Sequence, residues 1–485
     1  MDVTCCVNRL PGWGMNRFFD RKEWRRGFPR RGYARLDDLE PIVPGPDDDL
    51  TFVFDVVDAD WEGFGPDGVF DLEAPDLEPR MAAYWSDRFE GGRFDGPDGY
   101  DKVPIYRVEV SLRCGDPLID ALPRSEEPWV SLELSEQPIG PEVQVYGGLF
   151  AAPTLAFLHV PPAPAPSASL NAIFDMTSWP DANRSDLLGA LQPQCDLEAL
   201  VCFDIGQGSA SALVCRCGLP IYYFDTGCGS GRNAPTAPAS IDFCTHASPT
   251  VILSHWDTDH WAGAANHAGL QSLTWVVPRQ SISTTHTAFA NGILKSGGHI
   301  LVVANGTAPL QWANGMQDYD LQRGTGSGRN GTGLALIVTD QPSGRSWVLT
   351  GDAGYDDLPH APPADVAAMV VPHHGADMGP SSIPFARSAS GYARLFYSFG
   401  PSNGHGPKKP PVRHPVAAAV SAHIGAGWGH GSWAAPPAGC LAGADILATA
   451  THLASHLEGA AAGWTGPPRL GHLGSCPNAM PVPQT

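Results

Sequence analysis

The sequence contains few charged residues, an excess of acidic over basic ones, and no long apolar run. Only 30 Lys and Arg residues stand against 51 Asp and Glu, which leaves a formal net charge of −21. A field of that sign repels polyanions over roughly a Debye length, about 8 Å at physiological salt, so tight nonspecific binding of nucleic acid is disfavoured. The basic residues between Arg17 and Arg35 are an exception and indicate either a local basic patch or a solvated charge run.

Two further absences exclude other classes of protein. No stretch of about 20 apolar residues is free of Pro or Gly, so we predict no membrane span, and the first residues lack the apolar core of a signal peptide. The eleven cysteines contain no CxxC pair and show no regular spacing, which supports neither a zinc ribbon nor a disulfide scaffold. We therefore expect a reduced, cytoplasmic protein.

Length and composition predict a globular protein of two or three domains. A chain of 485 residues exceeds what one hydrophobic core of ordinary size takes up. Hydrophobic residues make up 43% of the chain, and 55 Gly and 47 Pro residues indicate a compact, loop-rich structure. We expect a β-rich N-terminal domain of unknown function over residues 1–190, a second domain over 195–460 and a Pro-rich tail over 461–485.

Hydrophobic patterning predicts strands in both halves. Apolar and polar residues alternate over residues 106–112 and 129–134, which is typical of half-buried strands. The Pro-rich run at 161–167 indicates a linker or an interdomain seam. From residue 195 onward, short apolar runs end in small or polar clusters, as the buried strands of a sandwich do. These runs lie at residues 199–203, 212–214, 221–224, 251–253, 334–338, 347–349, 369–371 and 395–397.

The strongest chemical signal is the segment Ser254–Trp261, SHWDTDHW, which directly follows one of these apolar runs. Imidazole and carboxylate groups at neighbouring positions of one loop can converge on two adjacent cations. His255 and Asp257 would face one cation, and Asp259 and His260 would face the other. Exposed polar residues without a metal are the less favoured interpretation.

Two more polar clusters follow apolar runs later in the chain. Asp352 comes after a run through a glycine that permits a tight approach, and a pair of metal ions needs such a shared anionic ligand. His373 and His374 end the next run, where a metal ligand is favoured over a buried structural histidine. The residues alone do not decide which of these two histidines would bind.

Taken together, these motifs resemble the metallo-β-lactamase superfamily, in particular the soluble C-terminal domain of the ComEC competence proteins. The likeness runs in order through seven motifs between about residues 200 and 420, and it does not cover the first 190 residues. The motifs are FDIGQG at 203–208, FDTG at 224–227, SHWDTDH at 254–260, NGTGL at 330–334, LTGD at 349–352, PHHG at 372–375 and SFGPSN at 398–403.

The resemblance implies an α/β (α+β) protein in which a four-layered αββα sandwich accompanies a separate β-rich domain. It also implies two divalent metal ions, Zn²⁺ or Mn²⁺, because three aspartates make the ligand set harder than one made mainly of histidine. The implied ligands are His255, Asp257, Asp259, His260, Asp352 and His373. Asp352 would bridge the ions, Asp204 would orient the ligand loop, and His374 would support a ligand or face the substrate.

The chain departs from the family pattern before and after the shared aspartate. The further histidine ligand that the superfamily has before Asp352 has no evident counterpart among His267, His286 and His299. Ser209 stands where competence-type domains often carry an aspartate.

The family's Gly-His-Pro-His ending is also replaced, by residues 403–415. Either His405 or His414 would contact the substrate or donate a proton there. The same segment carries Lys408, Lys409 and Arg413, which would either bind a phosphate or form a solvated loop.

The resulting hypothesis is a hydrolase that uses a metal-activated water, with Asp259 or Asp352 orienting it and His374, His405 or His414 beside the substrate. The likeness favours a phosphodiester in nucleic acid or a nucleotide, and hence a phosphodiesterase or nuclease. Two alternatives stay open: an acyl hydrolase acting on a lactone, thioester or β-lactam, and a regulatory protein with a non-catalytic metal site. The N-terminal half, which has no such motif, would recruit a protein partner or sense the substrate.

Overall fold

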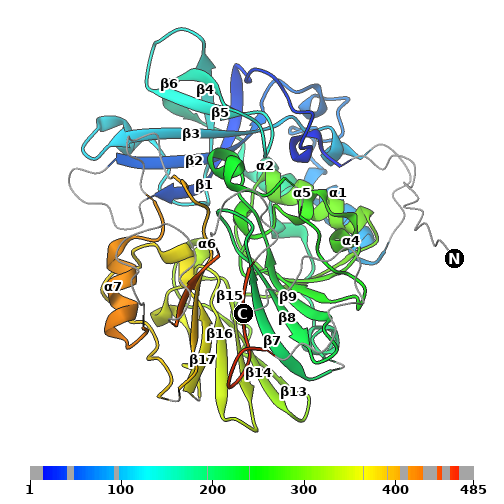
Figure 1. Ribbon diagram of the computed structural model, residues 1–485. Helices are drawn as coiled ribbons and strands as arrows, with labels where there is room; N and C mark the ends of the chain where they lie inside the picture. Colours follow the sequence, from blue (N-terminus) through cyan, green and yellow to red (C-terminus); the bar gives the residue numbers. More distant parts are fainter. Residues whose placement is uncertain are drawn as a thin grey trace, which may run out of the picture.

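The computed structural model describes most of the chain as a mixed α/β structure with several sheets (Figure 1). The described residues are 15–40, 49–91, 98–193, 195–239, 241–363, 365–389, 391–404, 413–429, 445–449 and 459–468. Their strands form one closed barrel and two sheets of seven strands each. The barrel comes first in the chain and lies above the two sheets in the view of Figure 1.

The barrel joins its strands in the order β1-β2-β3-β5-β6-β4, and neighbouring strands are antiparallel. The strands are β1 (Arg31–Glu40), β2 (Asp49–Asp58), β3 (Ile105–Arg113), β4 (Trp129–Ser135), β5 (Glu142–Tyr146) and β6 (Thr154–Pro164). Alternate side chains point inward, so Phe52, Phe54, Val108 and Val110 pack together inside. The two stretches with alternating polarity are β3 and β4, which confirms that prediction.

The proline-rich run is strand rather than linker over its first part. Ala163 and Pro164 still belong to β6 and pair with Ser131 and Val130 of β4. The pairing shifts register next to this point, and such irregular places accept proline, which cannot donate a ladder hydrogen bond. Helix α2 (Ser167–Phe174) follows almost at once. The domain boundary near residues 190–195 stays a prediction.

The first sheet has the order β12-β11-β10-β9-β8-β7-β20. Its strands are β7 (Leu197–Phe203), β8 (Ala210–Cys215), β9 (Pro220–Thr226), β10 (Thr250–Ile252), β11 (Thr274–Pro278), β12 (His299–Val303) and β20 (Gly459–Ala462). Strands β9 to β12 run parallel, whereas β7, β8 and β20 pair antiparallel. The carboxyl ends of β9 and β10 therefore meet at one edge of the sheet.

The second sheet follows chain order from β13 to β19. Its strands are β13 (Leu310–Ala313), β14 (Gln317–Arg323), β15 (Leu334–Asp340), β16 (Arg345–Leu349), β17 (Asp365–Val370), β18 (Arg394–Tyr397) and β19 (Ile446–Ala448). Parallel pairing of β16, β17 and β18 brings their carboxyl ends to one edge as well. All eight apolar runs predicted in this half overlap strands of the two sheets.

The two sheets share one hydrophobic core, to which β8 and β9 contribute Leu213 and Tyr222, and β15 and β16 contribute Leu336 and Trp347. The opposite face of the first sheet packs in a second core with α1, α2 and α5, and the opposite face of the second sheet packs with α7. The helices are α1 (Leu77–Phe89), α2, α3 (Arg184–Ala190), α4 (Ala268–Gln271), α5 (Thr284–Lys295), α6 (Gly328–Gly331) and α7 (Ala417–Gly425). Among the described helices, none combines the length and apolar character needed to span a bilayer.

The barrel packs directly on the helices that cover the first sheet, because buried side chains of both parts belong to one core. Val57 of β2 and Trp129 of β4 belong to the same core cluster as Phe174 of α2 and Phe289 of α5. Burial of such large side chains contributes on the order of 1.5–3 kcal/mol each. The barrel therefore has a defined position against the first sheet.

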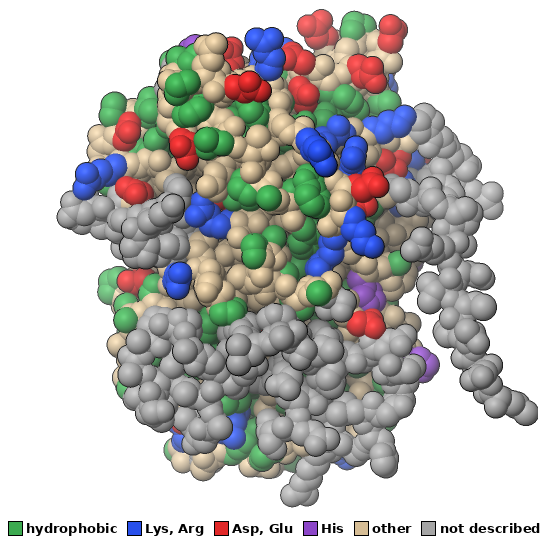
Figure 2. Space-filling model, turned by 45° about the horizontal axis from the view of Figure 1, so that its top comes forward, with side chains coloured by type: hydrophobic (Ala, Val, Ile, Leu, Met, Phe, Trp, Pro, Cys, Tyr) green, Lys and Arg blue, Asp and Glu red, His purple; other side chains and the backbone are tan. Residues whose placement is uncertain are grey.

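The arginines between Arg17 and Arg35 do not form an uninterrupted basic patch. Arg31 pairs with Asp60 at 2.7 Å on the surface, and Arg35 pairs with Asp175 at 2.8 Å in the interior. On the face drawn in Figure 2, described basic and acidic side chains are interspersed. Because Arg31 is paired on the surface and Arg35 is paired in the interior, neither adds an uncompensated charge to a nucleic-acid-binding patch.

The chain returns to the first sheet after residue 458, although we expected a loose tail from residue 461. β20 extends to Ala462 and pairs with β7, and Trp464 stacks on Trp347 with ring centroids 3.5 Å apart. The Trp464 indole also donates a hydrogen bond to the Leu197 carbonyl at 3.0 Å. Aromatic burial holds this segment, whereas residues 469–485 lie outside the described part.

We expect Trp464→Ala to lower the free energy of unfolding by about 3–5 kcal/mol, since it removes a buried indole and leaves a cavity beside Trp347. Urea denaturation followed by circular dichroism measures the change. Val69→Ala, at a side chain that is 48% exposed, is the control and should stay within about 0.5 kcal/mol of wild type. A Trp464 variant as stable as that control would contradict the packing of this segment.

Candidate metal centre

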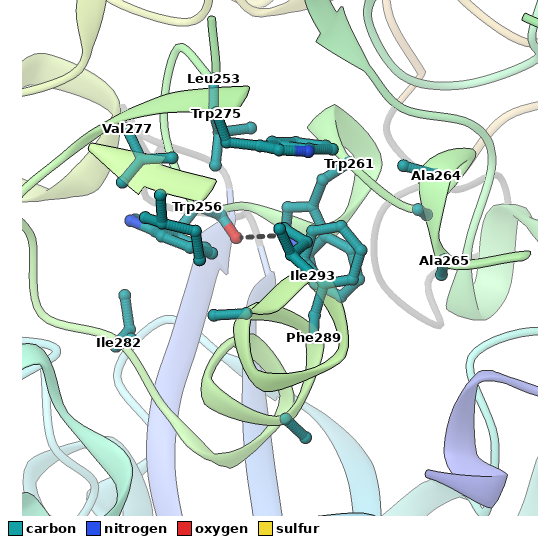
Figure 3. Close-up of a cluster of buried hydrophobic side chains, with 14 of the residues drawn as sticks. Leu253, Trp256, Trp261, Ala264, Ala265, Trp275, Val277, Ile282, Phe289 and Ile293 are labelled. Carbon is teal, nitrogen blue, oxygen red and sulfur yellow. Dashed lines mark hydrogen bonds between the residues drawn. The ribbon is translucent and has the colours of Figure 1, made fainter. Parts of the chain in front are cut away.

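The loop after β10 is held by its two tryptophans, which stand on either side of the polar residues 257–260. Trp256 and Trp261 are fully buried, and the Trp261 indole donates a hydrogen bond to the Trp256 carbonyl at 2.8 Å (Figure 3). Trp261 also stacks on Phe289 of α5, with ring centroids 4.2 Å apart. Because the indoles point into the core, the intervening His and Asp side chains are free to face the strand ends. A short 3-10 turn, η7 (Thr258–His260), forms the part of the loop that carries Asp259 and His260.

Asp352 lies between the histidines of this loop and those that follow β17. Its Oδ1 is 3.1 Å from His260 Nε2, and its Oδ2 is 3.8 Å from His255 Nε2. The same Oδ2 is 3.7 Å from His373 Nε2 and 3.9 Å from His374 Nε2. One carboxylate thus faces both sides of the cluster, which is the geometry required of a shared ligand.

His374 lies closer than His373 to the other side of the cluster. Its Nε2 is 3.1 Å from Asp259 Oδ2, and with His260 these residues form a group whose potential ligand atoms lie within 4.8 Å of one another. A second such group contains His255, His260 and Asp352. We had placed His373 among the ligands and left the choice between the two histidines open. The structure brings His374 to Asp259 and His373 to Asp352.

The backbone around these ligands adopts conformations that most residues avoid. His373 and His374, in the short turn η10 (Pro372–Gly375), have φ of 46° and 54°. Such left-handed backbone costs about 1–3 kcal/mol per residue and persists where the surroundings enforce it, as they do at functional sites. At Gly351, which has a φ of 58°, a Cβ would lie 2.4 Å from the Ser254 Cβ. A glycine is therefore required before Asp352.

Hydrogen bonds on the far sides of the imidazoles orient two of them. The Nδ1 of His260 donates to Asp225 Oδ2 at 2.8 Å, and the Nδ1 of His374 donates to the Ser398 carbonyl at 2.9 Å. Asp225 also accepts from the Ser254 backbone N–H at 2.7 Å and from its hydroxyl at 2.8 Å. Both Nε2 atoms are thereby left to face the carboxylates, with the tautomer that a metal ligand needs.

Asp225 was missed by the sequence reasoning, which expected Asp204 to orient the loop. Asp225 lies at the end of β9, next to β10 in the sheet, and so reaches Ser254 and His260 directly. The available signal was the FDTG motif at residues 224–227, which had been used only for the family resemblance.

The chemistry of this cluster fits a divalent cation. The Nε2 atoms of His255, His260 and His374 are buried and have no hydrogen-bond partner among the described residues. Burial opposes protonation of His260, yet the carboxylates of Asp352, Asp225 and Asp259 raise its pKa well above the usual range. Imidazole nitrogens surrounded by carboxylates form the kind of site in which proteins bind divalent metals through nitrogen and oxygen ligands.

Asp257 is held partly by an arginine. Its Oδ2 lies 3.3 Å from His255 Nε2, but its Oδ1 lies 3.0 Å from the Nε of buried Arg329. Arg329 in turn contacts Asp37 of β1 at 2.7 Å and Glu126 at 3.7 Å, so the barrel positions this guanidinium. Sequence reasoning missed Arg329, although it directly precedes the NGTGL motif.

The barrel also completes a cleft beside the cluster. A cavity of about 890 Å³ is lined by Asp257 and Asp352, by Arg279 and Arg329, and by barrel residues that include Asp37. A smaller hollow of about 70 Å³ contains Asp259 together with Arg107 and Arg232. Access to the cluster therefore depends on both halves of the chain.

The remaining candidates are placed as follows. His414 is buried beside His373, with ring centroids 5.5 Å apart, and its backbone exchanges two hydrogen bonds with the Asn403 side chain. His405, Lys408 and Lys409 lie outside the described residues, and Arg413 is exposed.

The three histidines that we had found no role for stay away from the cluster. His267 contacts Asp242, and His299 is exposed at the start of β12. His286, in the first turn of α5, faces Asp37 and Asp55 of the barrel. Ser209 acts through its backbone, which donates to the Asp259 carbonyl at 3.1 Å and accepts from Gly227 at 2.8 Å.

Comparison with known proteins adds little to this picture. No family model and no curated protein matches the chain. Among solved structures, the chain is similar to Zn(2+)-bound PqqB from Methylobacterium extorquens, with 11% sequence identity over 40% of this chain and 67% of that chain. The TM-score is 0.22, and a likeness of that degree carries no argument about function.

We expect Asp225→Asn to weaken binding of a divalent metal ion by roughly 10–100-fold, because the amide no longer fixes the tautomer and direction of His260. Titration against a competing chelator measures the affinity. Asp242→Asn is the matched control, since Asp242 pairs with His267 at 3.3 Å outside the cluster. Equal affinities for the two variants would contradict the orienting role of Asp225.

We expect Arg329→Gln to lower the free energy of unfolding by about 3–5 kcal/mol, because Asp37 and Asp257 would keep buried charges without their shared cation. Arg31→Gln removes an exposed arginine that also has a carboxylate partner at 2.7 Å, and should cost no more than about 1 kcal/mol. Chemical denaturation compares the variants. Similar losses of unfolding free energy in the two variants would contradict a stabilising role for the buried Arg329 network.

Proposed function

We propose that the chain is a metal-dependent hydrolase of the metallo-β-lactamase type. The observation that carries this proposal is the convergence of His255, Asp259, His260, Asp352 and His374 from loops after β10, β16 and β17. Two facing sheets with helices packed on their outer faces support the four-layered αββα arrangement of that superfamily. Oriented imidazoles and a shared carboxylate are features of a site built for metal.

We place one divalent ion with Asp259, His260, His374 and Asp352, and a second with His255, Asp257 and Asp352. The first position has four potential ligands and two imidazoles fixed by hydrogen bonds. The second has fewer ligands, and Asp257 is shared with Arg329. The mixture of imidazole and carboxylate favours Zn²⁺ or Mn²⁺.

Bound divalent ions would supply Lewis-acid activation of water and of the scissile group. The protein's own residues orient and enclose the reaction. The carboxylates of Asp259 and Asp352 lie on the two sides of the cluster and would accept a hydrogen bond from the attacking water. Asp225 keeps the His260 ring directed at Asp352. His414, next to His373 and held through its backbone by Asn403, would give a proton to a leaving group.

For the substrate we propose a phosphodiester, in a nucleotide or nucleic acid. Guanidinium groups line the spaces on both sides of the cluster: Arg279, Arg323 and Arg329 in the larger cleft, and Arg107 and Arg232 in the smaller hollow. Each of them also bonds to a protein acceptor. An arginine fork matches phosphate oxygens in geometry and charge. The barrel would then recognise the substrate or a protein partner, as it forms one wall of the cleft.

An acyl substrate is the second candidate, and one feature of the cleft favours it. Carboxylates outnumber guanidiniums along the larger cleft, where Asp37, Asp38, Glu126, Glu127, Asp356 and Asp357 add to the two aspartates of the cluster. Such a lining repels a polyanion but tolerates a lactone or thioester of low charge.

The deciding experiment is hydrolysis of bis-(p-nitrophenyl) phosphate, single-stranded DNA, a lactone and a thioester by metal-loaded protein. We expect Asp259→Ala to lower the rate of phosphodiester cleavage by more than about 100-fold. Substituting a residue that only hydrogen-bonds to a metal ligand already lowers activity roughly 10–100-fold, and Asp259 is a proposed ligand itself. Asp318→Ala, on the exposed side of β14, is the control and should retain wild-type activity.

Cleavage of acyl substrates alone, abolished by the same variant, would establish the second candidate. Protein that binds metal in the cluster but hydrolyses none of these substrates would contradict both, and protein that binds no metal there would overturn the proposed site itself.

A further inference from the structure

Three thiols gather at the opposite end of the first sheet from the His and Asp cluster. Cys195 precedes β7, Cys215 ends β8, and Cys217 lies in the turn to β9. Their sulfur atoms lie within 4.8 Å of one another, and the Sγ atoms of Cys195 and Cys217 are 3.7 Å apart. All three are free cysteines. Residues 20 positions apart in the sequence thus form one group through pairing of β7 with β8.

The backbone around these thiols is rigid. Cys215 donates to the Leu219 carbonyl at 2.9 Å, and Gly218, with a φ of 80°, donates back to the Cys215 carbonyl at 2.8 Å. Arg216 donates to the Asp196 carbonyl at 3.0 Å, which fastens the turn to the residue after Cys195. The three sulfur atoms are therefore brought together by the fold rather than by chance contact of mobile side chains.

The spacing of the sulfur atoms fits a metal better than a disulfide. A disulfide bond is about 2.05 Å long, far shorter than the separation of 3.7 Å between Cys195 and Cys217. Two sulfurs bound at about 2.3 Å to a tetrahedral zinc ion lie about 3.8 Å apart, which is close to the observed value. The thiol arrangement thus needs little movement to become a ligand set.

We infer that Cys195, Cys215 and Cys217 form a second metal site, for a thiophilic d10 cation such as Zn²⁺, with three thiolate ligands and a fourth position open to solvent. The buried Cys215 forms the inner wall, and the exposed Cys217 gives a cation access from outside. Binding forms three sulfur–metal bonds and releases the three thiol protons to solvent. Burial raises the pKa of Cys215 to about 11, so its proton must be displaced by the cation at neutral pH.

This site would stabilise the joint between the two sheets. Leu197, two residues after Cys195, accepts the Trp464 indole hydrogen bond and donates to the Gln317 side chain of β14 at 3.2 Å. Asn314, in the turn before β14, donates to the Cys195 carbonyl at 3.4 Å. A cation held by the three sulfurs would link these contacts to the β8–β9 turn, about 20 Å along β9 from the candidate catalytic cluster.

The inference is independent of the proposed hydrolase function, because its test measures a signal that only a metal bound to sulfur produces. Full-length protein is purified under reducing conditions, analysed for bound elements, stripped of metal and titrated with Co²⁺. We expect a thiolate-to-cobalt charge-transfer band that saturates at one ion per chain, which nitrogen and oxygen ligands do not produce. Zn²⁺ should abolish the band by displacement and protect the thiols from alkylation.

Cys217→Ser, and separately Cys195→Ser, should lose the band and one equivalent of bound metal, while Cys114→Ser, a free cysteine in the barrel, should keep both. Zinc or copper(I) that is present in the isolated wild-type protein and lost from the isolated Cys217→Ser protein would equally support a thiophilic site and identify its cation. Thiols that stay reactive at saturating Zn²⁺, an absent charge-transfer band, or a Cys195–Cys217 disulfide in the intact protein would overturn it.

Discussion

The buried carboxylate of Asp225 holds the ligand loop and the first sheet in one arrangement. It accepts hydrogen bonds from the backbone and hydroxyl of Ser254 and from the imidazole of His260. A buried carboxylate with three donors is strongly favoured over an unpaired one, because each missing bond would leave a desolvated charge. The direction of His260, and hence the position of the other ligands around Asp352, follows from this contact.

A second buried charge network connects this arrangement to the barrel. Arg329 is flanked by Asp257 from the ligand loop and by Asp37 and Glu126 from the barrel. Burying such ions is costly unless each has its partner, so the barrel and the cluster must be assembled together. The N-terminal half is consequently part of the candidate site, since it supplies both the charge balance and a wall of the cleft.

The two ends of the first sheet carry different chemistry. At one end, imidazoles and carboxylates follow β9 and β10, and at the other, three thiols surround the start of β7 and the β8–β9 turn. Imidazole and carboxylate groups suit harder cations than thiolates do, so the two sets would rank divalent cations differently, with Zn²⁺ acceptable to both. Antiparallel pairing of β7, β8 and β9 brings the start of β7 and the β8–β9 turn to one edge, whereas the parallel strands β9 and β10 end at the opposite edge.

Much of the fold and of the ligand loop could be predicted from the chain itself. Period-two alternation predicted β3 and β4, because a strand with one buried face alternates apolar and polar residues. Short apolar runs predicted eight strands of the two sheets, because a strand buried on both faces is apolar throughout. The segment from His255 to His260 was recognisable because its candidate ligands are neighbours in sequence. The linker alternative for the proline-rich run was wrong over residues 161–164, because proline composition does not show whether an irregular strand partner is present.

Sequence by itself determined many of the strands and the loop that carries the His and Asp residues, since these depend on residues close together in the chain. Only the tertiary structure decided that Asp225 orients His260, that His374 rather than His373 faces Asp259, and that Arg329 joins Asp257 to the barrel. It also brought Cys195 to Cys217. Those contacts depend on sheet order and on backbone turns, and a residue's local pattern carries no record of the partner that folding places beside it.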